Sequence, residues 1–280
     1  ELAQLNITLE TDRSNQVYET VRNALFLMGL DSENFASEKW NPLAEIVTPG
    51  DTVVIKPNFV LDLNVNDRTS QSTVTHGSVI RVIIDYVLLA LGGYGKIIVA
   101  DAPQMNCDFE RLIRKNGMKA VIDYYKKQLR DTPVEIDLID LRRERTIYKY
   151  GIVWQRIPLK GDPSGYTIVD LKKESELNGV DPKRFYGADY NRKETVAAHS
   201  KGHHKYFISN TILNADAVIS VPKLKVHRKV GVTLNVKNMV GINGNKNYLV
   251  HYQIGTQRQG GDEFSVESRQ AALDRRIKDL

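Results

Sequence analysis

Three apolar segments of the sequence end in side chains that could bind an anion or transfer a proton. The segments cover residues 53–55, 97–100 and 218–221, and a proline follows each of them closely. The side chains just beyond their ends are Lys56, Asn58, Asp101, Lys223, Lys225 and His227. In open α/β sheets, ligands bind outside the carboxyl ends of the strands. If the segments are neighbouring parallel strands, these side chains face one crevice. The alternative is ordinary surface polarity just beyond each strand.

The residue types suggest a division of roles within such a crevice. Lysine ammonium groups hold anions as point charges, amides orient hydroxyl groups, and imidazole titrates near neutral pH and can act as general acid or base. The predicted anion-holding residues are Lys56, Lys223 and Lys225, and the predicted orienting amides are Asn58, Asn235 and Asn238. The catalytic candidates are His227 or His76 as acid or base, Lys225, and Asp101, which would orient a histidine or bind a metal.

Two further segments could form walls of the site. Thr75 and Ser78 suit N-capping of a predicted helix, and the free N–H groups of a first helical turn bind anions. Asn235 and Asn238 flank Lys237, and asparagine is a poor helix former, so their amides could bind a polyol or phosphate oxygens. The alternatives are a plain helix cap and a plain turn that ends at Gly241.

The histidines of the second half do not make a convincing metal site. His199 and His203 have the i, i+4 spacing that could bind zinc on a helix, but the intervening Ser-Lys-Gly disfavours a helix. An exposed basic loop that includes His199, His203 and His204 and contacts an anion is the preferred interpretation, and no metal or cofactor is assigned. His251 and the pair at 262–263 could supply a base or metal ligands, with a solvated loop as the alternative. The basic segment 141–145 is typical of a solvated face, and no nucleic-acid or dinucleotide motif is present.

Helical and strand patterns alternate along the chain. Helices are predicted at 14–29, 77–91, 108–116 and 118–130, and buried strands at 52–55, 96–100, 134–141 and 215–221. Such alternation predicts an α/β fold with a mostly parallel, doubly wound (Rossmann-like) sheet. The predicted core is 1–141 with 211–280. The more polar region 142–210 is predicted to be an insertion or small second lobe, with strands at 154–159 and 166–171. Residues 61–74 are predicted to form a long loop, and a last helix is predicted from about 265.

The composition narrows the class of protein. The 280 residues are 41% hydrophobic and 26% charged, as expected for a soluble globular protein, and the net charge of +5 suits anionic partners. Cys107 is the single cysteine, so the chain has no internal disulfide and cannot hold an iron–sulfur cluster with its own thiolates. A reducing, cytoplasmic location is expected, without a signal peptide or transmembrane segment. The oligomeric state and trimming of the N-terminus at Glu1 stay open.

Several blocks of sequence resemble a known family. The segments VVIKPNF, THGSVIRVIIDYV, GKIIVADAP, GDPSGYTIVDL, LNADAVISVPKLKVHRKVGVTLNVKNMVGINGNK and GGDEF occur in order through roughly residues 50–264. They look like the domain-of-unknown-function family 362, and more specifically its stand-alone members among bacterial polysaccharide and capsule biosynthesis genes. Other members carry a ferredoxin-like iron–sulfur domain, for which this chain lacks the cysteines. A weaker similarity connects the family to the lactate racemase group, in which Lys and His serve a nickel-pincer cofactor. The resemblance supports the fold and the site and implies no established reaction.

The leading hypothesis is therefore an enzyme that binds an anionic small molecule, such as a phosphorylated or carboxylated sugar, at the strand ends, with a role in polysaccharide biosynthesis. One alternative is a metal-dependent enzyme with His and Asp ligands at the same site. The other is a non-enzymatic protein that binds an anionic polymer. Nucleic acid is an unlikely partner, because no basic stripe with an identifiable motif is visible.

Overall fold

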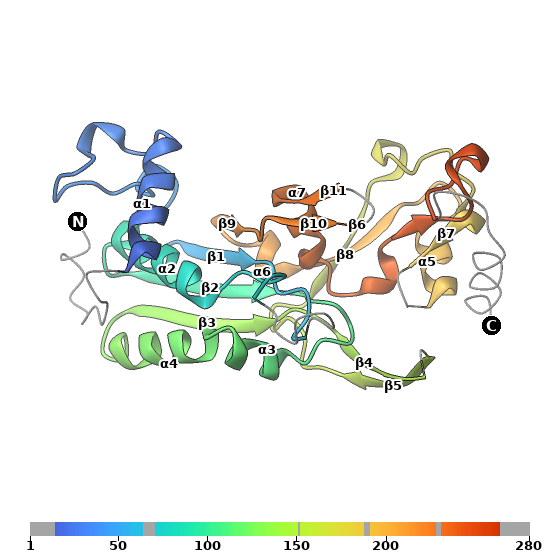
Figure 1. Cartoon of the computed structure of the whole chain (residues 1–280), viewed down its shortest axis with the longest axis horizontal. Coiled ribbons are helices and arrows are strands. Elements are labelled where there is room, and N and C mark those ends of the chain that lie inside the picture. Colours follow the sequence, from blue (N-terminus) through green and yellow to red (C-terminus); the bar gives the residue numbers. More distant parts are fainter. Residues whose placement is uncertain (1–14, 64–70, 151, 188–190, 228–230, 264–280) are drawn as a thin grey trace. The chain divides into compact units, whose positions relative to one another are not determined.

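A computed structural model of the chain describes residues 15–63, 71–150, 152–187, 191–227 and 231–263 (Figure 1). The chain divides into two compact units. Unit 1 comprises residues 1–165 and 209–244, and unit 2 comprises residues 166–208 and 245–280. All the predicted site residues belong to unit 1. The second lobe predicted from composition at 142–210 stays a prediction. Its residues 166–208 also belong to unit 2.

The described part of the chain is a mixture of helices and strands. The strands are Thr52–Pro57 (β1), Gly95–Asp101 (β2), Val134–Asp140 (β3), Glu144–Lys149 (β4), Ile152–Pro158 (β5), Tyr166–Asp170 (β6), Phe185–Tyr186 (β7), Lys205–Ser209 (β8), Ala217–Val221 (β9), Lys225–His227 (β10), Gly231–Thr233 (β11) and Tyr252–Gln253 (β12). The α-helices are Gln16–Leu27 (α1), Gly77–Leu91 (α2), Phe109–Lys115 (α3), Met118–Gln128 (α4), Arg192–Ala198 (α5), Asn210–Leu213 (α6) and Asn235–Asn238 (α7). Short 3-10 helices are Ser32–Asn34 (η2), Lys172–Glu174 (η3), Pro182–Arg184 (η4), Met239–Ile242 (η5), Lys246–Tyr248 (η6) and Gln257–Gln259 (η7).

A four-stranded, all-parallel sheet in the order β3-β2-β1-β9 is the centre of unit 1 (Figure 1). Its register pairs Ile55 with Val99 on one side and with Ile219 on the other. The three apolar segments at 53–55, 97–100 and 218–221 are therefore parallel neighbours, with β1 in the middle, which is the condition on which the predicted crevice depends. The remaining pairs are small two-stranded sheets: β4-β5, β10-β11, β6-β8 and β7-β12. The mixed α/β class is confirmed.

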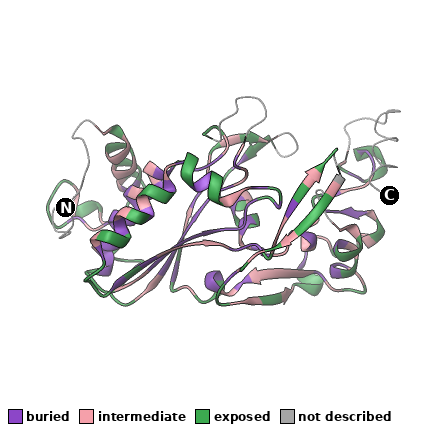
Figure 2. Cartoon of the chain, turned by 90° about the horizontal axis from the view of Figure 1, so that it is seen from below, coloured by how far each residue is buried: buried purple, intermediate pink, exposed green. Residues whose placement is uncertain are grey.

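The two faces of the parallel sheet are covered unequally, because successive residues of a strand point to opposite faces. Val53 and Ile55 pack into a large core with apolar residues of α1, α2, α3 and α4. Val54 lies in a smaller core with Ile212 of α6, and Ile242 of η5 packs against it. The two central strands, β1 and β2, are buried along most of their length, whereas β3 and β9 are only partly buried (Figure 2). Lys56 follows the parity of Val54, so it emerges on the thinly covered face.

A buried carboxylate joins three of the helices on the thick face. Asp85 of α2 is fully buried and accepts hydrogen bonds from the hydroxyls of Tyr18 in α1, at 2.5 Å, and Tyr125 in α4. Burial raises the pKa of Asp85, an effect opposed by the tyrosine hydrogen bonds and by Arg81. Helix α2 is thus joined to α1 and α4 by hydrogen bonds to Asp85 as well as by apolar packing.

The predicted elements recur with small changes in their bounds. The helices at 14–29, 77–91, 108–116 and 118–130 and the strands at 52–55, 96–100, 134–141 and 215–221 are present as α1 to α4, β1 to β3 and β9. Residues 64–70 of the predicted loop at 61–74 lie outside the described residues. The predicted final helix from about 265 also lies outside them. Among the helices that the structure describes, none combines the length and apolar character needed to cross a membrane.

Candidate functional site

Lys56 and Asp101 meet at the carboxyl ends of the neighbouring strands β1 and β2. The Lys56 Nζ lies 2.7 Å from Asp101 Oδ1, and the two side chains are only 1% and 4% exposed. Lys56 Nζ also donates to the Pro57 carbonyl at 2.7 Å, and Asp101 Oδ2 accepts from the Phe59 backbone N–H at 2.6 Å. Opposite charges on adjacent strand ends have neutralised each other inside the protein, so this lysine offers no open cationic surface.

The segment 238–241 closes over this ion pair. The Asn238 Oδ1 accepts from Lys56 Nζ at 3.1 Å, and its Nδ2 donates to the Lys56 carbonyl at 2.9 Å and to Ser220 Oγ at 3.0 Å. Gly241 lies so close that an added Cβ would be 1.9 Å from Asp101 Oδ1 and 2.6 Å from Lys56 Nζ. Only glycine fits at this position. Lys56, Asp101 and Asn238 are thus brought together as predicted, but as a closed cluster.

Thr75 joins the ends of β1 and β9. Its hydroxyl donates to the Val221 carbonyl at 2.7 Å and accepts from the Asn58 backbone N–H at 3.0 Å. The Asn58 amide in turn donates to the Thr73 carbonyl at 2.8 Å. The chain leaving β1 builds the sheet on one side through β2 and β3, whereas β9 joins on the other side. Ligands of open α/β sheets bind where the strand order reverses in this way, and Thr75 occupies that position.

The N-cap of α2 is His76, so the prediction of Thr75 or Ser78 as the cap is wrong. The His76 Nδ1 accepts from the Ser78 backbone N–H at 3.2 Å and lies 2.8 Å from Ser78 Oγ. The physical reason is that the Thr75 hydroxyl is already engaged across the strand ends, while the imidazole of His76 can reach the free N–H two residues on. His76 is exposed at the N-terminus of the 15-residue helix α2.

The hairpin of β10 and β11 carries the predicted lysine and histidine on one face. Lys225 pairs with Thr233 and His227 with Gly231, so Lys225 and His227 share the face on which Thr233 is buried. Loss of hydration lowers the pKa of Lys225 below its usual 10.5. Within the described residues no carboxylate forms an ion pair with this ammonium. Lys225 is therefore a half-buried cation without the neutralising partner that Lys56 has.

The other predicted residues differ in exposure. Lys223 precedes β10 and is half-buried, as is Lys237 in α7, whereas Asn235 in the same helix is exposed. Asn235 and Asn238 consequently do not act together, because Asn238 is buried against Lys56 and Ser220. Both amides were predicted to orient a ligand. The structure gives Asn238 a structural set of bonds, and it leaves Asn235 at the surface.

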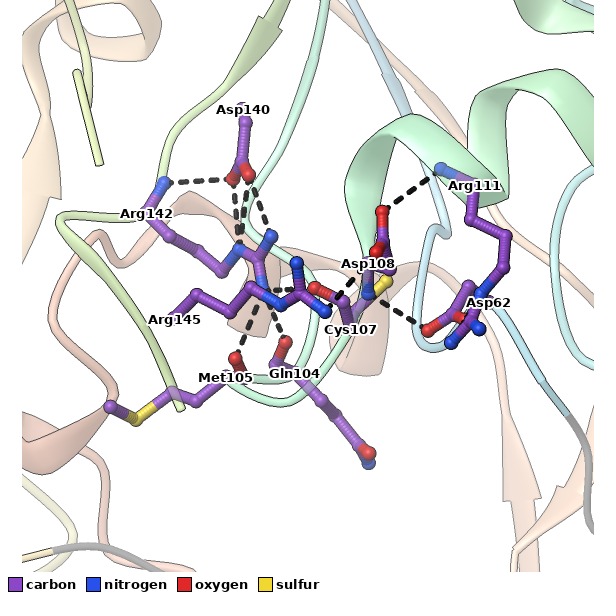
Figure 3. A network of polar contacts seen from close by, with 9 residues as sticks. All are labelled: Asp62, Gln104, Met105, Cys107, Asp108, Arg111, Asp140, Arg142 and Arg145. Atoms are coloured by element: carbon purple, nitrogen blue, oxygen red, sulfur yellow. Dashed lines mark hydrogen bonds and ion pairs between the residues drawn. The ribbon is translucent and has the colours of Figure 1, made fainter. Parts of the chain in front are cut away.

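Arg142 is an organising residue that the sequence pattern missed. The basic run 141–145 predicts a solvated face, but the Arg142 side chain is 1% exposed. Its guanidinium pairs with Asp140, with 2.6 Å between Nη2 and Oδ2, and Nη1 donates to the carbonyls of Gln104 and Cys107 (Figure 3). These bonds fix the loop that follows Asp101. A guanidinium has enough N–H donors to hydrogen-bond several carbonyls at once. The basic run in the sequence does not indicate that one of its arginines is buried in this way.

The same loop is held from its other side by Asp62. The Asp62 carboxylate accepts from the Asp108 backbone N–H at 2.8 Å and pairs with Arg111 of α3 (Figure 3). Arg145 of β4 pairs with Asp108 at 3.1 Å. Cys107, enclosed between these contacts, is fully buried, and burial raises the pKa of its thiol. The cysteine is therefore a packing residue in a rigid loop.

The histidines of unit 2 are structural contacts in this structure. His199 and His204 are buried, which overturns their interpretation as an exposed loop, and their Nδ1 atoms lie 3.3 Å apart. The His199 Nε2 lies 2.8 Å from the Tyr248 carbonyl, and His203 pairs with Asp170 at 2.6 Å. Residues 199–203 are not helical, as the intervening Ser-Lys-Gly predicts, because α5 ends at Ala198. In the part of the chain that is described, no group of three or more His, Cys, Asp or Glu residues could hold a metal ion.

Comparison with known proteins gives a family and no function. A family model described as Domain of unknown function (DUF362) matches residues 53–153 and 165–279, which is more than half of the chain. No curated protein and no solved structure matches the chain. The matched residues include β1, β2, β9, the β10–β11 hairpin and α7, so every candidate residue of the site lies within the family region.

Proposed function

The chain belongs to the DUF362 family, and we propose that it binds an anionic small molecule beside the ends of β1 and β9, with Lys225 as the principal cation. The observation that carries the proposal is the state of Lys225. Its ammonium is partly stripped of water, and no described carboxylate pairs with it. A bound phosphate or carboxylate would supply the missing counter-charge. Lys56 leaves the list of anion-holding residues, because Asp101 already neutralises it.

The local charge supports an anionic ligand. The sequence contains no Asp or Glu between Asp216 and Asp262, and this stretch includes Lys223, Lys225 and Lys237. The lysines of such a segment have no acidic residue nearby in the sequence to neutralise them, so the segment attracts anions. The position beside β1 and β9 also matches the place where ligands bind in open α/β sheets. The Rossmann-like form of the fold is part of the proposal, supported by the order β3-β2-β1-β9.

His227 extends the proposal from binding to catalysis. It follows Lys225 by two residues on the same strand face, roughly 7 Å along the strand. An anion held by Lys225 would have its neighbouring hydroxyl or carbonyl group within reach of the imidazole, which suits a general acid or base. A phosphorylated or carboxylated sugar fits these two groups, and polysaccharide biosynthesis would be the corresponding role. Since no described cluster suits a metal ion, the metal-dependent alternative is not favoured.

The test is calorimetric titration of the full chain with inorganic phosphate and with a hexose phosphate. Lys225→Gln removes the charge and keeps a side chain of similar length. We expect it to weaken binding about tenfold or more, as loss of one charge-assisted hydrogen bond would. Lys96→Gln is the matched control, because Lys96 is a half-exposed strand lysine already paired with Glu135 and Asp137. Unchanged binding in Lys225→Gln would refute the proposal.

Two further readouts separate the alternatives. Binding through the Lys225 ammonium is lost as the pH rises through its lowered pKa, so affinity falls before pH 10.5 is reached. An anionic polymer would instead bind over many charges, and its affinity would fall steeply and continuously with salt. Turnover of a hexose phosphate that disappears in His227→Gln while binding persists would support the catalytic extension.

A further inference from the structure

One face of the β10–β11 hairpin is apolar and exposed. Val226 and Val232 are cross-strand partners, and Leu224 and Leu234 adjoin the Lys225–Thr233 pair, one residue beyond the end of each strand. These four residues form the apolar hairpin face. Val226 is 88% exposed and Leu224 69%, and the two on the other side are each 48% exposed. The adjacent α7 adds Val236, which is 90% exposed.

This exposure follows from how the hairpin packs. The opposite face of the two strands carries Lys225, His227 and the buried Thr233. Since neighbouring residues alternate between the faces of a strand, burying Thr233 turns Leu224 and Val226 outward. Contiguous exposed apolar patches are rare on proteins that act alone in water, and they mark surfaces that contact a partner or a membrane.

The charge around the apolar hairpin face restricts the partner. Lys223 and Lys237 border it in sequence, and no acidic residue occurs between Asp216 and Asp262. A second copy of this chain would bring two basic segments together, and like charges oppose that pairing. A partner that has both apolar groups and negative charge would contact the aliphatic side chains and pair with the lysines.

We propose that the apolar hairpin face docks the protein on an anionic lipid surface. Val226 and Val236 protrude with nearly all of their surface free, so the patch has no walls to receive the anchoring side chains of a protein partner, which sit in pockets. Protruding aliphatic groups suit the boundary between headgroups and acyl chains, with neighbouring lysines at the anionic headgroups. The aliphatic side chains lie on the face of the hairpin opposite Lys225, so changes at Leu224 and Val226 leave the principal cation of the proposed anion site in place.

Vesicle sedimentation of the full chain tests the proposal. Phosphatidylcholine vesicles with and without phosphatidylserine are compared for three proteins. The first is wild type. The second carries Leu224→Ser and Val226→Ser. The third carries Leu27→Ser and Met28→Ser, a control pair that is 82% and 71% exposed at the end of α1. Thermal unfolding of each protein establishes that it is folded.

We expect wild type and control to bind the phosphatidylserine vesicles and the hairpin variant to bind them about tenfold or more weakly, as withdrawal of two aliphatic side chains from an interface would produce. Equal binding by all three proteins, or no binding by wild type, overturns the proposal. Capture of wild type by polyglutamate that requires Leu224 and Val226, in the absence of lipid binding, would assign the face to an acidic protein. A concentration-dependent dimer lost in the hairpin variant, in the absence of lipid binding, would assign it to a second copy.

Discussion

Removing the Lys56 charge should destabilise unit 1, because Lys56 is one half of a buried ion pair. Lys56→Met leaves the Asp101 carboxylate buried, at 4% exposure, without its counter-charge and with a hydrogen bond from the Phe59 N–H. It also takes a donor from Asn238 and from the Pro57 carbonyl. Breaking a buried ion pair by removing one partner costs about 3–5 kcal/mol. We expect the free energy of unfolding of unit 1 to fall by about this amount.

The chain offers a specific probe and a matched control for this measurement. Its two tryptophans, Trp40 and Trp154, both belong to unit 1, and Trp40 is fully buried, so fluorescence in urea follows unit 1. Lys96→Met removes a strand lysine whose ion pairs are exposed. Such surface pairs are worth about 0–1 kcal/mol, so the control should unfold close to wild type.

A double variant distinguishes loss of the ion pair from loss of packing. Asp101→Asn keeps an acceptor for the Phe59 N–H and removes the negative charge. If the two charges stabilise each other, Lys56→Met combined with Asp101→Asn should cost less than the sum of the two single changes by about 1–3 kcal/mol. Additive costs, or a Lys56→Met cost no larger than that of the Lys96 control, would refute the reasoning.

Four further predictions concern other contacts. Gly241→Ala should lower the unit 1 urea midpoint, because its Cβ has no room beside the ion pair; an unchanged midpoint contradicts the packing. Arg142→Lys should speed reaction of the single thiol, Cys107, with a disulfide reagent, since the loop loses its carbonyl contacts; equal rates would show that the loop holds without them. Burial raises the pKa of Asp85, so its charged form is disfavoured and stability is lost as the pH rises through that pKa. The stability of Asp85→Asn relative to wild type should therefore grow from pH 4 to pH 7 in urea titrations, and a constant difference contradicts it. Burial lowers the pKa of His199 below 6.5, so the unfolded chain takes the proton first and unit 2 loses stability as the pH falls through 6.5. The opening free energy obtained from amide exchange in α5 and β8, after correction for the pH dependence of the intrinsic exchange rate, should fall there, and a pH-independent value would argue otherwise.

The sheet could be predicted from the sequence because its signals are local. Short apolar runs bounded by prolines predict buried strands, and the alternation with helices predicts parallel pairing. Lys56 and Asp101 were placed correctly at strand ends. What the sequence did not show is that strands β1 and β2 are adjacent in register, which brings the two charges into contact with each other instead of with a ligand.

The errors concern residues whose surroundings come from distant parts of the chain. Arg142 is buried because carbonyls at 104–107, more than thirty residues earlier in the sequence, need donors. Thr75 does not cap α2 because its hydroxyl reaches Val221, which is 146 residues away. His199 is buried against the Tyr248 carbonyl, 49 residues away. In each case the local sequence shows a polar side chain, and only the tertiary fold determines which group it hydrogen-bonds.

The position of β9 sets an order in which the sheet can be assembled. β1, β2 and β3 follow one another in the first half of the chain, but β9 pairs with β1 across a long interval, and the Thr52 N–H bonds an Asp216 carboxylate 164 residues away. During synthesis one edge of β1 therefore stays without its partner until the ribosome has released residues 217–221. An open parallel edge of apolar residues invites pairing with another chain. Truncation before β9 should consequently yield an aggregating fragment, even though the other three strands of the sheet, β1, β2 and β3, are complete.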